Sequence, residues 1–463
     1  MRSPRSGGTR FRLFPSYAEG FAEPEVVELS LPPGMVGAGP ADPWMYTIDP
    51  VDKTEPYEPP HYVPPYRGRV YPPARPAPDG NFDHIEVESE QFPAAHLYGT
   101  MRLTLDVWER YLRRRVAWWD ASVIPRMELV TLVQWENAQS GPGFLETGRR
   151  ITQRGRPAPY CLNYDIIAHE TGHAILFSQM GVPRPEQIAA PFLAFHESFA
   201  DLVALIGVLH FDAVCTRLLE QTDGNLYAMN LLSRIGETSP TEQIRRADNT
   251  ATMDDVAGIT MAGDGTWIDP AGLGRNQHSI AEPLTGAVFD ILVEIYQDGL
   301  VARGLIPPHR DPRGWTRDEV AASMDPIRHE SAAAFDRFAQ GFYAALDDAR
   351  HVVGRCMAHV MLTVHPEGLT FGLVAARFLE AAAALGQAPN LRYLLDDFLW
   401  RGIDPRPFLS LTIPSGGGRR GDTRGWLGVR DPPNPSPYCA CCDIGGLWHA
   451  RRHMNHPHRA SPG

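Results

Sequence analysis

The sequence contains little cysteine and almost no lysine. Six cysteines in 463 residues are too few for a disulfide-bonded scaffold. Lys53 is the only lysine among 43 basic residues, which we interpret as a bias in the base composition of the genome. The formal net charge of −12 argues against a nucleic-acid-binding protein, because that class usually carries a basic face or a high pI.

Long apolar stretches are also missing. Pro15, Glu19 and Glu23 interrupt any apolar core of an N-terminal signal peptide. No stretch of 18 residues is free of charged residues, so we expect no membrane span. We therefore expect a cytoplasmic protein by default, with export by a non-classical route left open. Nothing in the sequence indicates an oligomeric state.

Residues 1–80 form a proline-rich segment that holds 17 of the 43 prolines. Its pairs of adjacent prolines exclude regular helix. Because the segment also contains aromatic residues, two interpretations stay open. It is either an extended arm that wraps over a folded domain or a disordered leader.

Periodic patterns begin near residue 94. Apolar residues at steps of three and four over 94–116 predict an amphipathic helix. The Val- and Leu-rich stretch 128–134 predicts a strand. Apolar helices are expected over 165–181 and 191–211, and four or five further helical segments follow from residue 282 onward. Helices and strands together predict a mixed fold.

The motif H-E-x-x-H spans His169, Glu170 and His173. Residues i and i+4 of a helix lie on one face, so both imidazoles can reach one metal ion. Zinc takes histidine nitrogen ligands at about 2.0–2.1 Å. Glu170 is adjacent to the first histidine and can act as general base toward a metal-bound water. The sequence therefore predicts two zinc ligands and a catalytic base.

The next expected helix contains a candidate third ligand. Glu197 lies 24 residues after His173, and Asp201 lies one turn after Glu197 on the same face. No Lys or Arg lies between Arg184 and Arg217, and two buried carboxylates without a cation are costly. We therefore predict that Glu197 binds the metal and that Asp201 orients a ligand histidine from the outer shell.

These motifs resemble the thermolysin-like and fungalysin-like metallopeptidases, in pieces from about residue 94 to 403. The stretch from Asp165 to Ala174 resembles the family's active-site helix, and Glu197 with Asp201 matches its E-x-x-x-D motif. Gln179 stands where metzincins have a third histidine, which excludes that group. The gluzincins, with glutamate as third ligand, remain.

The resemblance also implies residues that bind substrate. Asn137 and Ala138 resemble the edge-strand pair that holds the substrate backbone. Arg245, with Arg246 as a rival, would bind a substrate carbonyl, and His278 would stabilise the tetrahedral oxyanion. Three aliphatic residues fall where the family lines its first primed subsite, which implies an apolar residue after the scissile bond: Ile166, Ile235 and Ile244.

Several positions depart from the family pattern. Val208 and Arg234 replace acidic residues of its calcium cluster, so we do not expect a double calcium site. Leu273 stands where the family has an aspartate that orients the oxyanion histidine, so His278 requires another partner. No tyrosine lies in the segment between the second and third zinc ligands, which leaves a second oxyanion donor unassigned.

The C-terminal tail combines cysteines and histidines that could hold a second, structural zinc. Their spacing is irregular and Gly and Pro surround them, which favours a tail with incidental Cys and His residues. The residues concerned are Cys439, Cys441, Cys442, His449, His453, His456 and His458.

The whole pattern predicts a zinc endopeptidase of the gluzincin type that acts on peptides or proteins. The resemblance implies an α+β, two-lobed zincin fold. It would have a mixed α/β N-terminal lobe over 81–181 and a mainly helical C-terminal lobe over 182–410, with zinc between the lobes and a tail over 411–463. Two alternatives remain, a zinc aminopeptidase and a catalytically silent zincin-fold binding module. Other zinc-dependent hydrolysis, such as deacylation, also stays open.

Overall fold

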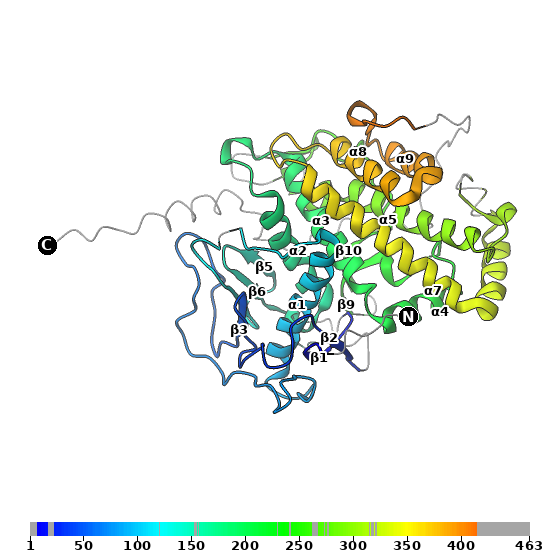
Figure 1. Cartoon of the computed structure of the whole chain (residues 1–463). Coiled ribbons are helices and arrows are strands. Elements are labelled where there is room, and N and C mark those ends of the chain that lie inside the picture. The colour runs from blue at the N-terminus through cyan, green and yellow to red at the C-terminus, as the bar shows by residue number, and fades with distance from the viewer. Residues whose placement is uncertain are drawn as a thin grey trace. The chain divides into compact units, whose positions relative to one another are not determined.

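The structure is a computed structural model that mixes helices with short strands, which confirms the predicted α+β class (Figure 1). It divides into two compact units, each described by itself below. Of the described residues, those within Met1–Ile188 and Gly236–Glu242 belong to unit 1, and those within Ala189–Ile235 and Gln243–Ser436 belong to unit 2. The domain boundaries drawn from the sequence stay a prediction. The residues that the structure describes are 7–16, 23–119, 121–151, 155, 157–228, 230–239, 242–261, 267–272, 274–275, 277–313, 315, 319 and 322–413.

Unit 1 is built on a four-stranded sheet with the order β3-β4-β6-β5. Its strands are β3 (Met45–Ile48), β4 (Met127–Val130), β5 (Ala138–Gly141) and β6 (Phe144–Thr147). β3 and β6 both pair parallel to β4, whereas β5 pairs antiparallel to β6 and forms an edge. Glycines bound two of these short strands, because β5 ends at Gly141 and Gly148 follows β6.

Two helices pack on this sheet and on each other. α1 (Phe92–Leu112) contacts β3 and α2, and α2 (Tyr164–Met180) contacts β5 and β6. Both are apolar along their packed faces, as their sequence periods predict. Smaller elements complete the described part of unit 1: β1 (Arg10–Leu13), β2 (Glu25–Glu28), β7 (Arg149–Ile151), β8 (Pro157–Pro159) and the 3-10 turns η1 (Tyr160–Leu162) and η2 (Pro185–Gln187).

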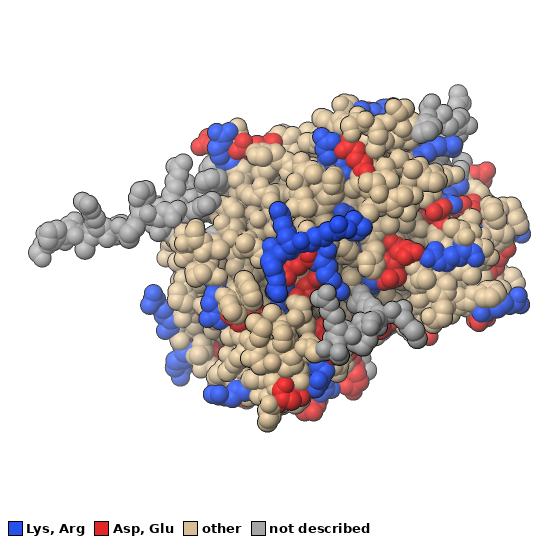
Figure 2. All heavy atoms as spheres, in the orientation of Figure 1, with Lys and Arg blue, Asp and Glu red and all other residues tan. Residues whose placement is uncertain are grey.

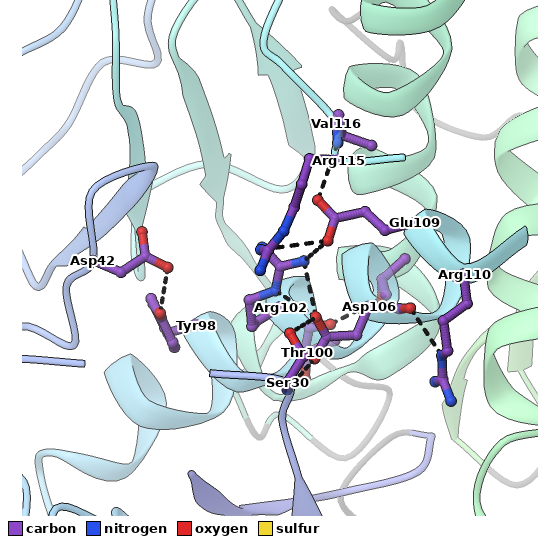
Figure 3. A network of polar contacts seen from close by, with 11 residues as sticks. Ser30, Asp42, Tyr98, Thr100, Arg102, Asp106, Glu109, Arg110, Arg115 and Val116 are labelled. Atoms are coloured by element: carbon purple, nitrogen blue, oxygen red, sulfur yellow. Dashed lines mark hydrogen bonds and ion pairs between the residues drawn. The ribbon is translucent and has the colours of Figure 1, made fainter. Parts of the chain in front are cut away.

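A buried polar network fastens the proline-rich segment to α1 (Figure 3). Arg102 donates to Asp106 at 2.9 Å and to Glu109 at 2.7 Å. Asp106 also accepts from the backbone N–H and the hydroxyl of Ser30, at 2.7 and 2.6 Å. Asp106 therefore accepts hydrogen bonds both from Arg102 on the helix and from Ser30 in the proline-rich segment. Charge-assisted bonds of this kind are among the stronger ones in proteins.

His96 makes a second tie between the segment and the helices. Phe14 N–H donates to His96 Nε2 at 3.0 Å, and His96 Nδ1 lies 2.8 Å from the carbonyl oxygen of Cys161. These partners fix the neutral tautomer with the proton on Nδ1, and burial lowers the pKa of His96 to about 4. The ring joins β1, α1 and the turn that leads into α2.

The C-terminal end of α1 is strongly basic. Arg110, Arg113, Arg114 and Arg115 are exposed there, and Figure 2 shows basic side chains gathered over this end of the helix with acidic ones beside them. Arg113 adopts the left-handed conformation that ends the helix, with φ of 56°. Arg114 Nε donates to Oε1 of Gln179 at 2.7 Å, which ties the ends of α1 and α2 together. Positive charge at a helix C-terminus complements the helix dipole.

Unit 2 is mainly helical. α3 (Ala190–Val208) packs against α5 (Gln277–Ala302), α5 packs against α7 (Met324–Thr363), and α8 (Phe371–Ala382) and α9 (Leu391–Trp400) pack on this group. α7 is bent where Phe338 leaves helical geometry. The other elements of unit 2 are α4 (Asp212–Thr222), β11 (Thr260–Met261), β12 (Trp267–Ile268), β13 (Gly274–Arg275), η3 (Leu231–Ser233), η4 (Pro308–Arg310), the π-turn Ala383–Gln387, η6 (Ala388–Asn390) and η7 (Arg406–Phe408). The paired strands β9 (Arg234–Ser239) and β10 (Glu242–Arg246) have residues in both units.

α3 is the most apolar long helix in the part of the chain that the structure describes. By length and composition alone it could cross a membrane, but 94% of the relevant window is buried within the protein. A core helix of a globular protein passes the same test, so this finding is weak evidence for a membrane span.

Candidate metal centre

α2 carries the H-E-x-x-H motif, and its start is well capped. Asn163 is the N-cap residue, and its side chain accepts from Ile166 N–H at 3.2 Å. Asp165 lies in the first turn, where negative charge is favourable. Gly181 ends the helix with φ of 79°. The helix predicted over 165–181 is therefore present, and its regular geometry sets the spacing of the motif.

His169 and His173 point their Nε2 atoms at the same place. The two Nε2 atoms are 3.1 Å apart, and the rings are almost perpendicular, with centroids 4.6 Å apart. Two nitrogen ligands of one tetrahedral zinc, each at about 2.05 Å, are separated by about 3.3 Å. Both side chains are buried. The pair therefore has the geometry that one zinc ion requires.

Glu170 is also buried on α2, next to the first of these histidines. The hydroxyl of the next residue, Thr171, donates to the carbonyl of Ile167 at 2.7 Å. This hydroxyl therefore bonds to the helix backbone and not to the Glu170 carboxylate. A carboxylate adjacent to a metal ligand is chemically suited to take a proton from a metal-activated water.

α3 holds Glu197 and Asp201 on one buried face in unit 2. Oε2 of Glu197 lies 2.8 Å from Nδ1 of His278, and Oε1 lies 3.8 Å from Nδ1 of His196. The Glu197 side chain is fully buried. A buried carboxylate is stable only with compensating hydrogen bonds or charge, and a bound cation would supply such a charge.

His278 lies in the first turn of α5. The sequence analysis left the partner of His278 open, because Leu273 replaces the family's aspartate, and the structure places Oε2 of Glu197 2.8 Å from its Nδ1. The sequence missed this pair because the two residues are 81 positions apart and no local pattern connects them.

The described residues contain one group of His, Cys, Asp or Glu side chains that could hold a metal ion, namely His169, His173 and Glu197. Two imidazoles and one carboxylate form the donor set of many catalytic zinc sites, in which a water takes the fourth position. Calcium and magnesium prefer oxygen donors only, so the imidazoles make them a poor match. The residues therefore fit zinc.

Glu282, one turn after His278 on α5, is a titratable residue that the sequence did not single out for a role. Burial and then the negative charge of Asp201 raise the pKa of Glu282 to about 7, while Arg275 and Arg401 oppose that shift. The signal in the sequence that could have identified Glu282 is an acidic residue within an apolar helical stretch, where burial raises a carboxyl pKa.

The substrate-binding residues taken from the resemblance differ in what the structure shows of them. Asn137 directly precedes the edge strand β5, and Ala138 begins it. The N–H of Ala138 donates to Asn137 Oδ1 at 2.9 Å, and Ile166 is buried on α2. Arg246, the alternative to Arg245 for binding a substrate carbonyl, forms an ion pair with Asp248 at 2.9 Å.

The remaining predicted residues lie partly or wholly outside the described positions. The backbones of three of them belong to β9 and β10, but their side chains are not among those described: Ile235, Ile244 and Arg245. The cysteines and histidines of the tail, from Cys439 to His458, lie outside the described residues altogether.

Comparison with known proteins gives remote similarities to solved structures only. No protein-family profile matches this chain, and no curated protein matches it. Among solved structures, the chain is similar to the precursor of protealysin, a metalloproteinase from Serratia proteamaculans. The two share 10% sequence identity with a TM-score of 0.45, and the match covers 81% of this chain and 90% of that chain.

Proposed function

We propose that this protein is a zinc metallopeptidase of the gluzincin type that cleaves peptide bonds inside a chain. The observation that carries the proposal is the pair of Nε2 atoms of His169 and His173 at 3.1 Å, adjacent to the buried carboxylate of Glu170. Glu197 would complete a His₂Glu ligand set. These residue types in these positions match water-activating zinc sites rather than structural ones, which are usually closed by four protein ligands.

When bound, the zinc would polarise the scissile carbonyl and lower the pKa of a water. Glu170 would take the proton from that water as it attacks and pass it to the leaving amine. His278, whose Nδ1 lies 2.8 Å from Oε2 of Glu197, would donate to the developing oxyanion. Asp201 would orient a ligand histidine through the nitrogen that faces away from the metal.

The edge strand β5 supports the proposed mode of substrate binding. A peptide could extend the sheet there by pairing with the edge, as extended peptides do at exposed strands. The proposal places Asn137 and Ala138 at the start of that edge. Ile166, Ile235 and Ile244 would line the subsite after the scissile bond, which predicts a bulky apolar residue at that position, and Arg245 would bind a substrate carbonyl.

The test uses a pool of unstructured peptides analysed by mass spectrometry, with the wild type and Glu170→Gln in parallel. Internal cleavage by the wild type alone, before apolar residues, is the expected result. N-acetylated copies of the peptides separate the two peptidase types, because an aminopeptidase cleaves only the free-amine forms. If neither protein cleaves any peptide although zinc is bound, the site is a silent binding module or acts on a different bond.

A further inference from the structure

Alternation along the strands places three polar side chains on one face of the unit 1 sheet. Gln139 on β5 lies directly opposite Glu146 on β6, and Val130 on β4 is paired with Glu146 from the other side. Glu128 shares this face, two residues before Val130. The same two strands, β5 and β6, also contact α2.

Residues 51–71 cover that face. Tyr57 packs with Val130, Val133 and Phe144 in a buried cluster, against which a set of half-buried aromatic and aliphatic residues lies: Ile48, Tyr62, Tyr66 and Trp135. The hydroxyl of Tyr57 donates to Glu128 at 2.5 Å. The loop is therefore part of the core of unit 1 and not a surface appendage.

The only lysine of the protein, Lys53, belongs to this loop. Lys53 Nζ is 2.9 Å from Oε2 of Glu146, and the two side chains are 1% and 0% exposed. The ammonium also donates to the carbonyl of Glu55 at 2.5 Å and lies 3.9 Å from the ring centre of Tyr57 and 4.7 Å from that of Tyr62. A compact ammonium suits this enclosed cage, whereas the planar guanidinium used at the other basic positions is larger.

Glu146 also forms a hydrogen bond with the edge strand β5. Its Oε1 accepts from the side-chain amide of Gln139 at 2.6 Å and from Tyr57 N–H at 2.6 Å. The same amide of Gln139 donates to the carbonyl of Tyr57 at 2.9 Å. Lys53, Glu146 and Gln139 thus form a continuous chain of contacts that ends on β5, one residue after Ala138.

We propose that Lys53 is a positioning residue for peptide binding, because it keeps Glu146 in place to hold Gln139 and, through it, the edge strand β5. The substrate role rests on the proposed function, in which β5 pairs with the peptide. Burial lowers the pKa of Lys53 and raises the pKa of Glu146, and each charge opposes the shift of the other. Loss of the ammonium therefore leaves a buried acid without compensation, and its hydrogen bonds to β5 weaken.

The test compares Lys53→Met and Gln139→Ala with the wild type, using the full-length zinc-loaded protein. Lys53→Met removes the charge, and Gln139→Ala keeps the Lys53–Glu146 pair but removes its link to β5. Hydrogen exchange by mass spectrometry reports residues 136–148, and steady-state kinetics on a cleaved peptide report KM and kcat. Arg10→Met is the matched control, because it removes another ion pair of unit 1, Arg10 with Asp83 at 2.6 Å, that does not reach β5.

Both variants should exchange faster at β5, by about 25-fold for Gln139→Ala, which loses two hydrogen bonds worth about fivefold each. KM should rise with kcat little changed, because the lost contacts stabilise the bound substrate and the transition state equally. The zinc content of both variants should equal that of the wild type, and Arg10→Met should match the wild type in exchange, KM and kcat. The single lysine gives a fold check: an amine-acetylating reagent should leave Lys53 unmodified in native wild type and in Gln139→Ala.

Unchanged exchange at β5 in Gln139→Ala, with Lys53 still protected, would overturn the proposal. So would an equal fall in kcat and kcat/KM with KM unchanged, because that pattern places the defect in the chemical step. A wild type that cleaves no peptide would instead remove the proposed function and the substrate role with it. The exchange result would still decide whether Lys53 orders β5.

Discussion

Nδ1 of His278 on α5 lies 2.8 Å from Oε2 of Glu197 on α3, the carboxylate that we propose as the third metal ligand. Outer-shell partners of this kind are worth about 10–100-fold in metal affinity or activity. We predict that His278→Ala weakens zinc binding by about that factor and also lowers kcat. Competition with a chromogenic zinc chelator measures the first effect, and peptide cleavage at saturating zinc measures the second.

A role for His278 in oxyanion stabilisation alone predicts a different outcome, in which kcat falls and the zinc affinity stays at the wild-type value. His351→Ala is a suitable control, because His351 is an exposed histidine of the same unit and should change neither quantity.

A buried ion pair at the end of α9 should dominate the stability of unit 2. Arg401 is fully buried and donates to Asp290 at 2.8 Å and to the backbone carbonyls of Asn249 and Ala251 at 2.8 and 2.9 Å. Arg401→Met would leave the acid buried without its partner, which costs about 3–5 kcal/mol. Urea unfolding monitored by circular dichroism measures the loss.

The guanidinium of Arg401 packs closely against Gly286, so adding one methyl group at Gly286 should also reduce stability. A Cβ atom at Gly286 would lie 2.4 Å from Cζ of Arg401, so Gly286→Ala should destabilise by about 1–3 kcal/mol, although alanine favours helix. Arg406→Met removes an exposed pair with Asp404 and should leave the unfolding curve nearly unchanged. Equal effects of Arg401→Met and Arg406→Met would contradict the account.

Glu282 should make stability depend on pH. Burial raises its pKa in the folded state to about 7, above the model-compound value of 4.5. Between these two values the unfolded chain has lost the proton and the folded chain has kept it, so the free energy of unfolding falls as the pH rises from about 4.5 to about 7. Below that window the carboxyl is protonated in both states, and this loss is absent.

Glu282→Gln should remove this contribution. In urea titrations with EDTA at pH 5 and pH 8, the variant should lose less stability between the two pH values than the wild type does. Glu220→Gln, on the exposed side of α4, should behave as the wild type. If Glu282→Gln shows the same pH dependence as the wild type, the carboxyl is already ionised in the folded protein.

The parts of the site that could be predicted from sequence are those that depend on local spacing. His169, Glu170 and His173 are fixed by the helical repeat, and a capped apolar helix made both its existence and its register predictable. Contacts between distant segments were not predictable. His278 and Glu197 are separated by 81 residues, and only the packing of α5 on α3 brings them together.

In the proline-rich segment, the secondary structure also could not be fully predicted from the sequence. Its prolines correctly exclude helix, but they gave no indication that Met45–Ile48 is a strand of the unit 1 sheet. A four-residue strand has too few alternating positions to stand out. Lys53 likewise looked like a trace of base composition, and only the burial of its side chain against Glu146 identifies a site shaped for an ammonium group.

The most direct test of the central claim is the zinc content of purified protein, measured by plasma mass spectrometry after dialysis, for the wild type and four single variants. We predict one zinc per chain in the wild type and in Glu170→Gln, and loss of most zinc in His169→Ala, His173→Ala and Glu197→Ala. Full zinc in all three ligand variants would contradict the assigned ligand set. Loss of zinc in Glu170→Gln alone would contradict the role of Glu170 as a base that is not a ligand.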